Sequence, residues 1–385
     1  MKIGIIDADL LANTRHRFPN LACMKLSGFY KEKGAQTELL SDYRKVREYE
    51  QVYISKVFTD TLVPEDILQL KNVSYGGTGF FYDNAEPLSY EIEHHMPDYG
   101  LYDRVVEEKK KAGEKHSAYQ FYTDYSMGFL TRGCFRQCGF CVNHSSTQAV
   151  PASPLKEFYD PGRKKLCFLD DNFLACAKWE PLLEEVLETG KRFQFRQGLD
   201  IRIMQKKQMQ KLFQGKLDGN VIFAFDNILD KEVIVRKLEL LYETVPAYKK
   251  ELKFYVLCGY DRKGAWNYDF WGKDIRDTLE RIRILMHYGC LAYVMRYKNW
   301  KDAPKGYRGM YINISRWCNQ PAQYSKKSLR QFCKGQGEQS SSYQYLTEFE
   351  YLHPELSPYL DMTFEEVLYG KVQRMKYGLQ NPLTL

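Results

Sequence analysis

Short apolar runs alternate with amphipathic stretches along the first hundred residues. The helical pattern is clearest at residues 21–33, where Leu21 and Met24 share one face and Gly34 marks the end. The runs that predict buried strands are residues 3–6, 52–57 and 72–75. Because strands and helices that alternate at this spacing form parallel sheets, we expect a doubly wound, Rossmann-like α/β domain over residues 1–102.

A second, more regular alternation begins after residues 103–118, whose lysines and glutamates predict a linking helix or hinge. Its expected strands are residues 126–130, 166–170, 193–196, 221–226, 253–258 and 291–296. Its expected helices are residues 178–188, 204–213, 231–243 and 274–286. The alternation permits a barrel of strand and helix units over residues 119–300, and equally a second doubly wound sheet.

Residues 301–385 are rich in tyrosine, serine and glutamine and end with a helical pattern at residues 364–377. We expect this segment to form a small helical cap. Cys318 and Cys333 lie here without neighbours at ligand spacing, so we expect both to be buried core thiols.

The composition is that of a folded protein with a mild positive charge. The 385 residues suffice for two or three domains, and 44% of them are apolar and 27% charged. The net charge of +7 permits a nucleic-acid partner without arguing for one, because acidic residues interrupt most basic runs. The lysines at 109–111 follow two glutamates and are expected on a solvated face, whereas Lys326, Lys327 and Arg330 are better phosphate candidates.

The sequence shows neither a secretory leader nor a membrane-length apolar run. Residues 1–7 form a strand pattern that ends at an acid, which is unlike a signal peptide. The ten cysteines are therefore expected to be thiols or metal ligands in a reducing compartment, the cytoplasm.

Three cysteines at the spacing Cys134-x3-Cys138-x2-Cys141 carry the strongest chemical signal in the chain. Three thiolates can hold three irons of a cubane cluster and leave the fourth iron open for chemistry, whereas electron-transfer ferredoxins use four cysteines at other spacings. The alternative is a zinc site completed by His144, but zinc ligands usually come as two separated pairs. We therefore expect His144 to be a polar loop residue.

With residues 127–133 before it and Phe140 beside its last cysteine, this motif resembles the cluster loop of the radical S-adenosylmethionine (radical SAM) superfamily. The resemblance implies a [4Fe-4S] cluster on Cys134, Cys138 and Cys141 that cleaves S-adenosylmethionine reductively and generates a 5′-deoxyadenosyl radical. It also implies that the second alternation is a partial (βα)6 TIM-type barrel, and that a reducing partner such as flavodoxin or ferredoxin supplies electrons.

Residues 1–102 resemble the cobalamin-binding-like domain that precedes many radical SAM cores. The matching features are the helix opened at residues 19–21, the strand at residues 49–55 and a strand that ends in Gly76 and Gly77. No Asp-x-His-x-x-Gly motif follows the early strands, so no histidine is offered to cobalt and cobalamin stays undecided. With cobalamin the resemblance implies methyl transfer; without it, rearrangement, dehydrogenation and sulfur insertion remain open.

Contacts to S-adenosylmethionine are expected after the barrel strands, because ligands bind at the carboxyl ends of strands in parallel barrels. Asp170 and Asp171 follow the second strand, where the family has a polar motif for the methionine amine, and carboxylates suit a cation. The alternative is a helix N-cap at Asp171 or Asn172.

Arginine fits a carboxylate at two points, so Arg196 or Arg202, after the third strand, is expected to hold the methionine carboxylate. Asp200 and, after the fourth strand, Asp226 are expected at the ribose hydroxyls. The competing function is a zinc-stabilised nucleic-acid-binding module, with zinc at the cysteines. No motif in the chain names the substrate.

Overall fold

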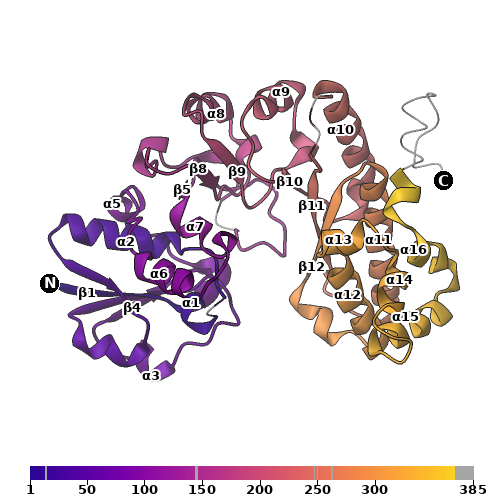
Figure 1. Ribbon diagram of the computed structural model, residues 1–385, viewed down its shortest axis with the longest axis horizontal. Coiled ribbons are helices and arrows are strands. Elements are labelled where there is room, and N and C mark those ends of the chain that lie inside the picture. Colours follow the sequence, from indigo (N-terminus) through magenta and orange to yellow (C-terminus); the bar gives the residue numbers. More distant parts are fainter. Residues whose placement is uncertain (14, 144–145, 247, 249, 262, 369–385) are drawn as a thin grey trace. The chain divides into compact units, whose positions relative to one another are not determined.

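The computed structural model describes residues 1–368, apart from residues 14, 144–145, 247, 249 and 262 (Figure 1). The chain forms two compact units, Met1–Gln197 and Gly198–Leu385. No helix in the described part of the chain is both long enough and apolar enough to cross a membrane.

A four-stranded parallel sheet occupies the start of the first unit, with the strand order β2-β1-β3-β4 (Figure 1). Its strands are β1 (Lys2–Asp7), β2 (Gln36–Leu39), β3 (Gln51–Ser55) and β4 (Val73–Gly76). The predicted parallel sheet is confirmed. The chain order reverses between β1 and β3, and such a switch point is where parallel sheets bind ligands.

Helix α2 (Leu21–Glu32) covers one face of this sheet and packs against β1, β2 and β3. It begins where the Asn20 side chain accepts a hydrogen bond from the backbone N–H of Cys23, a cap that stabilises a helix by about 1 kcal/mol. The shared core of strand and helix side chains consists of Ile3, Ile5, Leu21, Cys23, Met24 and Leu26. Burying each large apolar side chain stabilises the fold by roughly 1.5–3 kcal/mol. Packing against the sheet therefore stabilises α2 more than its intrinsic helix propensity does.

A second parallel sheet, of order β5-β8-β9, lies in the same unit. Its strands are β5 (Tyr125–Gly128), β8 (Lys165–Phe168) and β9 (Arg192–Phe195). A short antiparallel pair, β6 (Thr131–Arg132) and β7 (Val150–Pro151), follows β5 and brackets residues 133–149. This pair was not predicted, because two-residue strands leave no periodic pattern.

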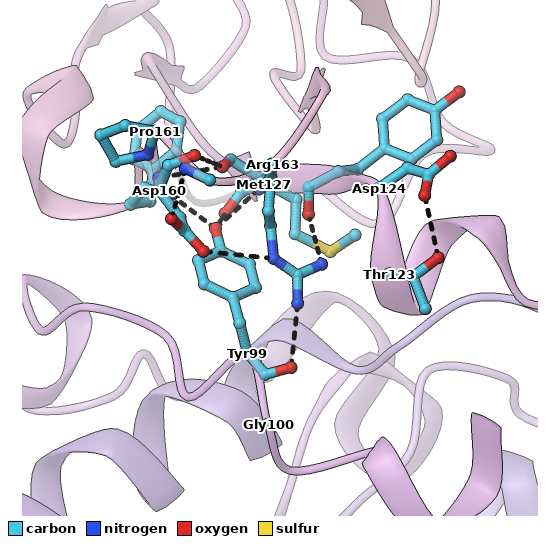
Figure 2. Close-up of polar contacts among 12 residues, drawn as sticks. Tyr99, Gly100, Thr123, Asp124, Met127, Asp160, Pro161 and Arg163 are labelled. Atoms are coloured by element: carbon cyan, nitrogen blue, oxygen red, sulfur yellow. Dashed lines mark hydrogen bonds and ion pairs between the residues drawn. The ribbon is translucent and has the colours of Figure 1, made fainter. Parts of the chain in front are cut away.

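Arg163 fastens the start of β5 to the segment that follows the first sheet (Figure 2). Its guanidinium donates hydrogen bonds to the carbonyls of Tyr122 (2.8 Å), Tyr125 (3.1 Å) and Tyr99 (2.9 Å). The Tyr99 hydroxyl in turn accepts from the backbone N–H of Met127 at 2.9 Å. Burial lowers the pKa of Arg163, but arginine titrates so far above neutrality that the side chain stays charged.

The second unit is built on a third parallel sheet, of order β10-β11-β12, which α11 (Tyr268–His287) and α12 (Lys305–Cys318) cover. Its strands are β10 (Ile222–Ala224), β11 (Lys253–Cys258) and β12 (Leu291–Arg296). Helices α14 (Leu329–Lys334) and α15 (Ser341–Leu352) pack on α12. The predicted core thiols Cys318 and Cys333 are confirmed, with 2% and 0% of their surface exposed.

The remaining helices are shorter or lie between strands. In the first unit they are α1 (Ala8–Ala12), α3 (Glu65–Leu68), α4 (Thr78–Phe81), α5 (Tyr90–Glu93), α6 (Asp103–Lys111), α7 (Gln120–Thr123) and α8 (Trp179–Glu188). In the second unit they are α9 (Lys206–Gln214), α10 (Lys231–Thr244), α13 (Pro321–Tyr324) and α16 (Ser357–Asp361). The four helices predicted between strands correspond to α8, α9, α10 and α11.

The six strands predicted after residue 119 all form, as two parallel sheets of three. Their closure into one (βα)6 barrel, and the domain limits at residues 102, 118 and 300, stay predictions. The prediction of a solvated face at residues 109–111 is wrong for Lys109, which is 5% exposed and pairs with Glu114 at 3.4 Å. Of the predicted helix at residues 364–377, residues 369–377 lie outside the described part of the chain.

Candidate cofactor site on the cysteine loop

The three predicted cluster ligands lie on residues 133–149, the cysteine loop, which β6 and β7 bracket. Cys134, Cys138 and Cys141 are half-buried, and all ten cysteines of the chain are free thiols. The backbone N–H of Cys141 donates to the carbonyl of Cys138 at 2.8 Å, which turns the chain tightly between these two cysteines. The three thiols of the loop are therefore partly exposed to solvent.

Hydrogen-bond donors approach the sulfurs of the first and last of these cysteines. The Cys134 sulfur accepts from the backbone N–H of Arg136 at 3.5 Å, and the Cys141 sulfur from that of Asn143 at 3.4 Å. Burial raises the pKa of the Cys141 thiol, and the hydrogen bond from Asn143 opposes that rise. Such donors stabilise thiolates and tune the potential of iron–sulfur clusters.

No group of three or more His, Cys, Asp or Glu side chains is arranged as a set of metal ligands anywhere in the described ranges. The chemistry of the donor set nevertheless fits an iron–sulfur cluster, because it offers three thiols on one loop with N–H donors at two of the sulfurs. His144, the fourth ligand of the zinc alternative, lies outside the described residues.

Asp170 follows β8 and holds the start of the cysteine-loop segment in place. Its carboxylate accepts from the backbone N–H groups of Leu130 (3.2 Å) and Thr131 (2.6 Å) and from the Thr131 hydroxyl (2.7 Å). Burial raises the pKa of Asp170 to about 7 in spite of these donors. Both oxygens are thus already engaged in a structural contact, and the predicted contact with a methionine amine stays a prediction.

The two residues after Asp170 extend the same attachment toward the first cysteine. Asp171, which is exposed, accepts from the backbone N–H of Gly133 at 2.8 Å. The side-chain amide of Asn172 donates to the Cys134 sulfur at 3.4 Å. We call these three residues, Asp170, Asp171 and Asn172, the β8 clamp. In order along the chain, they bind Leu130 and Thr131, then Gly133, then Cys134.

Asn172 also carries a buried acceptor without a partner. The residue is 3% exposed, and its side-chain oxygen Oδ1 is buried with no hydrogen bond. It is the N-cap residue of a short 3-10 helix, η5 (Phe173–Ala175), as the alternative prediction placed it, but its side chain makes no capping hydrogen bond there. An unsatisfied buried acceptor costs about 1–3 kcal/mol, a cost that a donor from a water or from a bound molecule would remove.

Phe140 is half-buried, and its carbonyl accepts from the Tyr82 hydroxyl at 3.0 Å. Tyr82 follows α4 and has a φ of 45°, a backbone conformation that residues other than glycine seldom adopt. The loop after the first sheet thus contacts the cysteine loop directly. Sequence reasoning missed Tyr82, because no periodic pattern or motif marks it.

Arg196 directly follows β9 in the first unit. Its backbone N–H donates to the carbonyl of Phe168 at 2.8 Å, and its guanidinium lies 5.3 Å from the ring centre of Phe121 and 5.9 Å from that of Phe18. This stacking on aromatic faces holds the guanidinium at the carboxyl end of β9, and its predicted contact with a carboxylate stays a prediction.

The other predicted contacts lie in the second unit. Arg202 bridges two carboxylates, Asp200 and Asp230, at 2.7 Å each. Asp226 accepts from the backbone N–H of Leu257 at 3.0 Å, and burial raises its pKa. The structure therefore pairs Asp200 with Arg202, whereas the sequence analysis assigned them to different ends of the cofactor.

The switch point of the first sheet is lined by buried polar groups that bond one another. Asp7, at the end of β1, accepts from the Tyr102 hydroxyl at 2.8 Å, and the Asn20 amide donates to the Ser55 hydroxyl at 2.9 Å. Burial raises the pKa of Asp7 to about 6. These groups satisfy one another without a ligand.

Gly77, which follows β4, is crowded by the chain itself. A Cβ there would lie 2.4 Å from the Lys56 carbonyl, and its φ is 103°. Five large apolar side chains in the segments after β3 and around the end of β4 are exposed: Val57, Phe58, Leu62, Tyr75 and Phe81. The rings of Tyr75 and Phe81 stack with their centres 5.8 Å apart.

No protein-family model and no curated protein sequence matches this chain. Among solved structures it is similar to the cobalamin-dependent S-adenosylmethionine radical enzyme OxsB. The apo form is 13% identical, with 77% of this chain and 49% of that chain covered and a TM-score of 0.35. The form with aqua-cobalamin bound is 12% identical, with 93% and 56% covered and a TM-score of 0.36. The chain thus spans about half the length of these structures.

Proposed function

We propose that this protein is a radical SAM enzyme whose [4Fe-4S] cluster is held by Cys134, Cys138 and Cys141. The observation that carries the proposal is the cysteine loop itself. It offers three thiols at the motif spacing, N–H donors at two of the sulfurs, and an attachment to the end of β8 through the β8 clamp.

The residues of the loop and the clamp would have separate tasks. Bound there, a reduced [4Fe-4S] cluster supplies the electron that splits S-adenosylmethionine into methionine and a 5′-deoxyadenosyl radical. Asn172 holds the Cys134 sulfur through its amide nitrogen and offers its unpaired Oδ1 to a donor, for which the methionine ammonium is suited. Asp171 adds a negative charge beside it, while Asp170 fixes the backbone of the loop.

Methyl transfer is the reaction we propose if cobalamin binds the first unit. The support is that Val57, Phe58, Leu62, Tyr75 and Phe81, which follow β3 or lie around the end of β4, are exposed apolar side chains of the kind that suits the apolar flank of a corrin ring. The buried polar groups at the switch point satisfy one another, so cobalamin would have to be held mainly by such apolar side chains and by backbone groups. Flavodoxin or ferredoxin is the proposed electron donor.

The test begins with protein that is reconstituted anaerobically with iron and sulfide, reduced with dithionite and given S-adenosylmethionine. We expect brown protein that forms 5′-deoxyadenosine and methionine, measured by liquid chromatography and mass spectrometry, and we expect Cys138→Ala to form neither. Colourless protein that retains one zinc would contradict the proposal and favour the zinc-stabilised module. Incubation with hydroxocobalamin followed by desalting tests the proposal of methyl transfer. Protein that shows no corrinoid absorbance after this treatment would exclude cobalamin-dependent methyl transfer.

A further inference from the structure

The positive charge of this protein is concentrated in one segment of the second unit. Residues 291–330 contain nine lysines and arginines and one acidic residue, whereas the net charge of the whole chain is +7. The rest of the chain is therefore close to neutral. The net charge of the whole chain does not reveal where the positive charge lies, so it gave no argument for a polyanionic partner.

Within this segment, one stretch of the chain carries several exposed cationic side chains. It passes from the end of β12 through a 3-10 helix, η8 (Lys298–Asp302), into the first turn of α12. We call it the basic surface; its members are Arg296, Lys298, Lys301, Lys305 and Arg308, all of them exposed.

In the described part of the chain, four of the five cations of this surface, Arg296, Lys301, Lys305 and Arg308, form no ion pair with an acidic side chain. Asp302 accepts from the side-chain amide of Asn299 at 3.0 Å, and the exposed Glu348 carboxylate lies beside Gly306, 3.1 Å from the position of an added Cβ. The four cations without an ion pair outnumber these two carboxylates, so this stretch keeps a net positive charge that attracts an external anion.

Aromatic rings lie among these charges and are held in fixed positions. The Arg296 guanidinium lies 4.1 Å from the ring centre of Trp300, and Tyr297 packs edge-on against Tyr260 at 4.8 Å. Trp300 rests on Gly259, where an added Cβ would lie 3.2 Å from the Trp300 Cβ. Rings fixed beside cations are the features that bind unpaired bases and their phosphates together.

We propose that the basic surface binds single-stranded nucleic acid, with phosphates on its cationic groups and bases stacked on Trp300 and Tyr297. None of the large exposed apolar side chains lies within residues 296–308. The basic surface therefore lacks the apolar centre typical of a protein–protein interface, and it lacks apolar side chains that could insert into a lipid bilayer. The inference goes beyond the proposed function, because it concerns the second unit and requires no cluster.

Fluorescence anisotropy of the full-length protein with a labelled oligonucleotide of about 15 nucleotides, either oligo(dT) or oligo(U), tests this proposal. The variant Lys301→Gln/Lys305→Gln/Arg308→Gln removes three charges from the basic surface. The matched control Lys111→Gln/Lys164→Gln/Lys206→Gln removes three exposed charges elsewhere. Far-ultraviolet circular dichroism verifies that both variants are folded.

We expect the wild type and the control to bind at about 50 mM salt, and the basic-surface variant to bind at least about tenfold more weakly. The slope of log affinity against log salt should become shallower by about 2 in that variant, since each phosphate contact contributes about 0.7. The oligomer that binds more tightly identifies DNA or RNA as the ligand.

Three results would overturn the proposal. The first is no binding of either oligonucleotide at low salt, including the case in which anionic phosphatidylserine vesicles bind instead. The second is an equal loss of affinity in both triple variants. The third is equal affinity for an abasic oligonucleotide of the same length, which would reduce the surface to a general polyanion site.

Discussion

Asn172 combines two properties that the sequence alone did not connect. Its amide nitrogen donates to the Cys134 sulfur at 3.4 Å, and its buried oxygen has no partner. A hydrogen bond to a cluster sulfur favours the reduced, more negative cluster. Because one such bond is worth about 0.5–1.5 kcal/mol, Asn172→Leu should lower the one-electron midpoint potential of the reconstituted cluster by about 20–60 mV.

Potentiometric titration followed by electron paramagnetic resonance measures this change. The control Asn220→Leu alters a half-buried asparagine of the second unit that donates to the Glu251 carbonyl, and it should leave the potential unchanged. An Asn172→Leu potential equal to that of the wild type would show that the side chain does not act on the cluster.

Asp170 and Asp171 are adjacent in sequence but should respond differently to substitution. Asp170→Ala leaves two buried N–H groups and a hydroxyl without an acceptor, so the free energy of unfolding should fall by at least about 3 kcal/mol in urea titrations. Asp171→Ala should weaken S-adenosylmethionine binding by about 1.5–3 kcal/mol, measured by calorimetry, with little loss of stability. Unchanged affinity in Asp171→Ala would remove Asp171 from the cofactor site.

At the scale of elements, the cysteine loop depends on Gly133. Its φ is 94°, and an added Cβ would lie 2.1 Å from the Gln148 carbonyl and 2.3 Å from the Ser146 hydroxyl. Gly133→Ala should therefore displace the loop and abolish iron retention, measured by colorimetric iron assay, while the circular dichroism spectrum stays that of a folded protein.

Gly113→Ala is the matched control. Gly113 also has a positive φ, 71°, but nothing lies within 4 Å of its added Cβ. Both variants therefore carry the backbone cost of roughly 1–2 kcal/mol, and only Gly133→Ala carries the clash. Equal iron retention in the two variants would show that the loop tolerates the displacement.

Most elements could be predicted from the sequence, because buried strands and amphipathic helices leave periodic patterns. Strand β2 could not, since its Gln-Thr-Glu-Leu sequence lies at a sheet edge and alternates exposed with half-buried positions. The sequence analysis assigned Asp170 and Asp171 of the β8 clamp to the methionine amine, and it named Asn172 only as a possible helix cap. A carboxylate directly after a buried strand equally predicts a structural acceptor, and only the positions of Leu130 and Thr131 decide between the two.

At the scale of the whole molecule, buried carboxyl groups make stability depend on pH. Burial raises the pKa of Asp7 to about 6, well above that of the unfolded chain. Between about pH 4 and pH 6 the unfolded chain has lost this proton while the folded chain retains it, so Asp7 stabilises the fold at low pH and this contribution is lost as the pH rises. The loss amounts to about 3 kcal/mol.

Asp7→Asn keeps the shape of the side chain and removes its charge. We expect the stability of the wild type relative to this variant, measured by urea unfolding, to decline as the pH rises from 4 to 7 and then to level off. A difference that does not change with pH would show that Asp7 titrates normally. Asp170, whose pKa is raised to about 7, should contribute in the same direction in both proteins.

Iron and sulfide content after anaerobic reconstitution tests the central claim most directly, because it reports on the cysteine loop without requiring a substrate. We predict about four irons and four sulfides per chain in the wild type and in the buried-thiol controls Cys318→Ala and Cys333→Ala. Cys134→Ala, Cys138→Ala and Cys141→Ala should each lose this content. A full complement of iron and sulfide in Cys138→Ala, or one zinc and no sulfide in the wild type, would contradict the account.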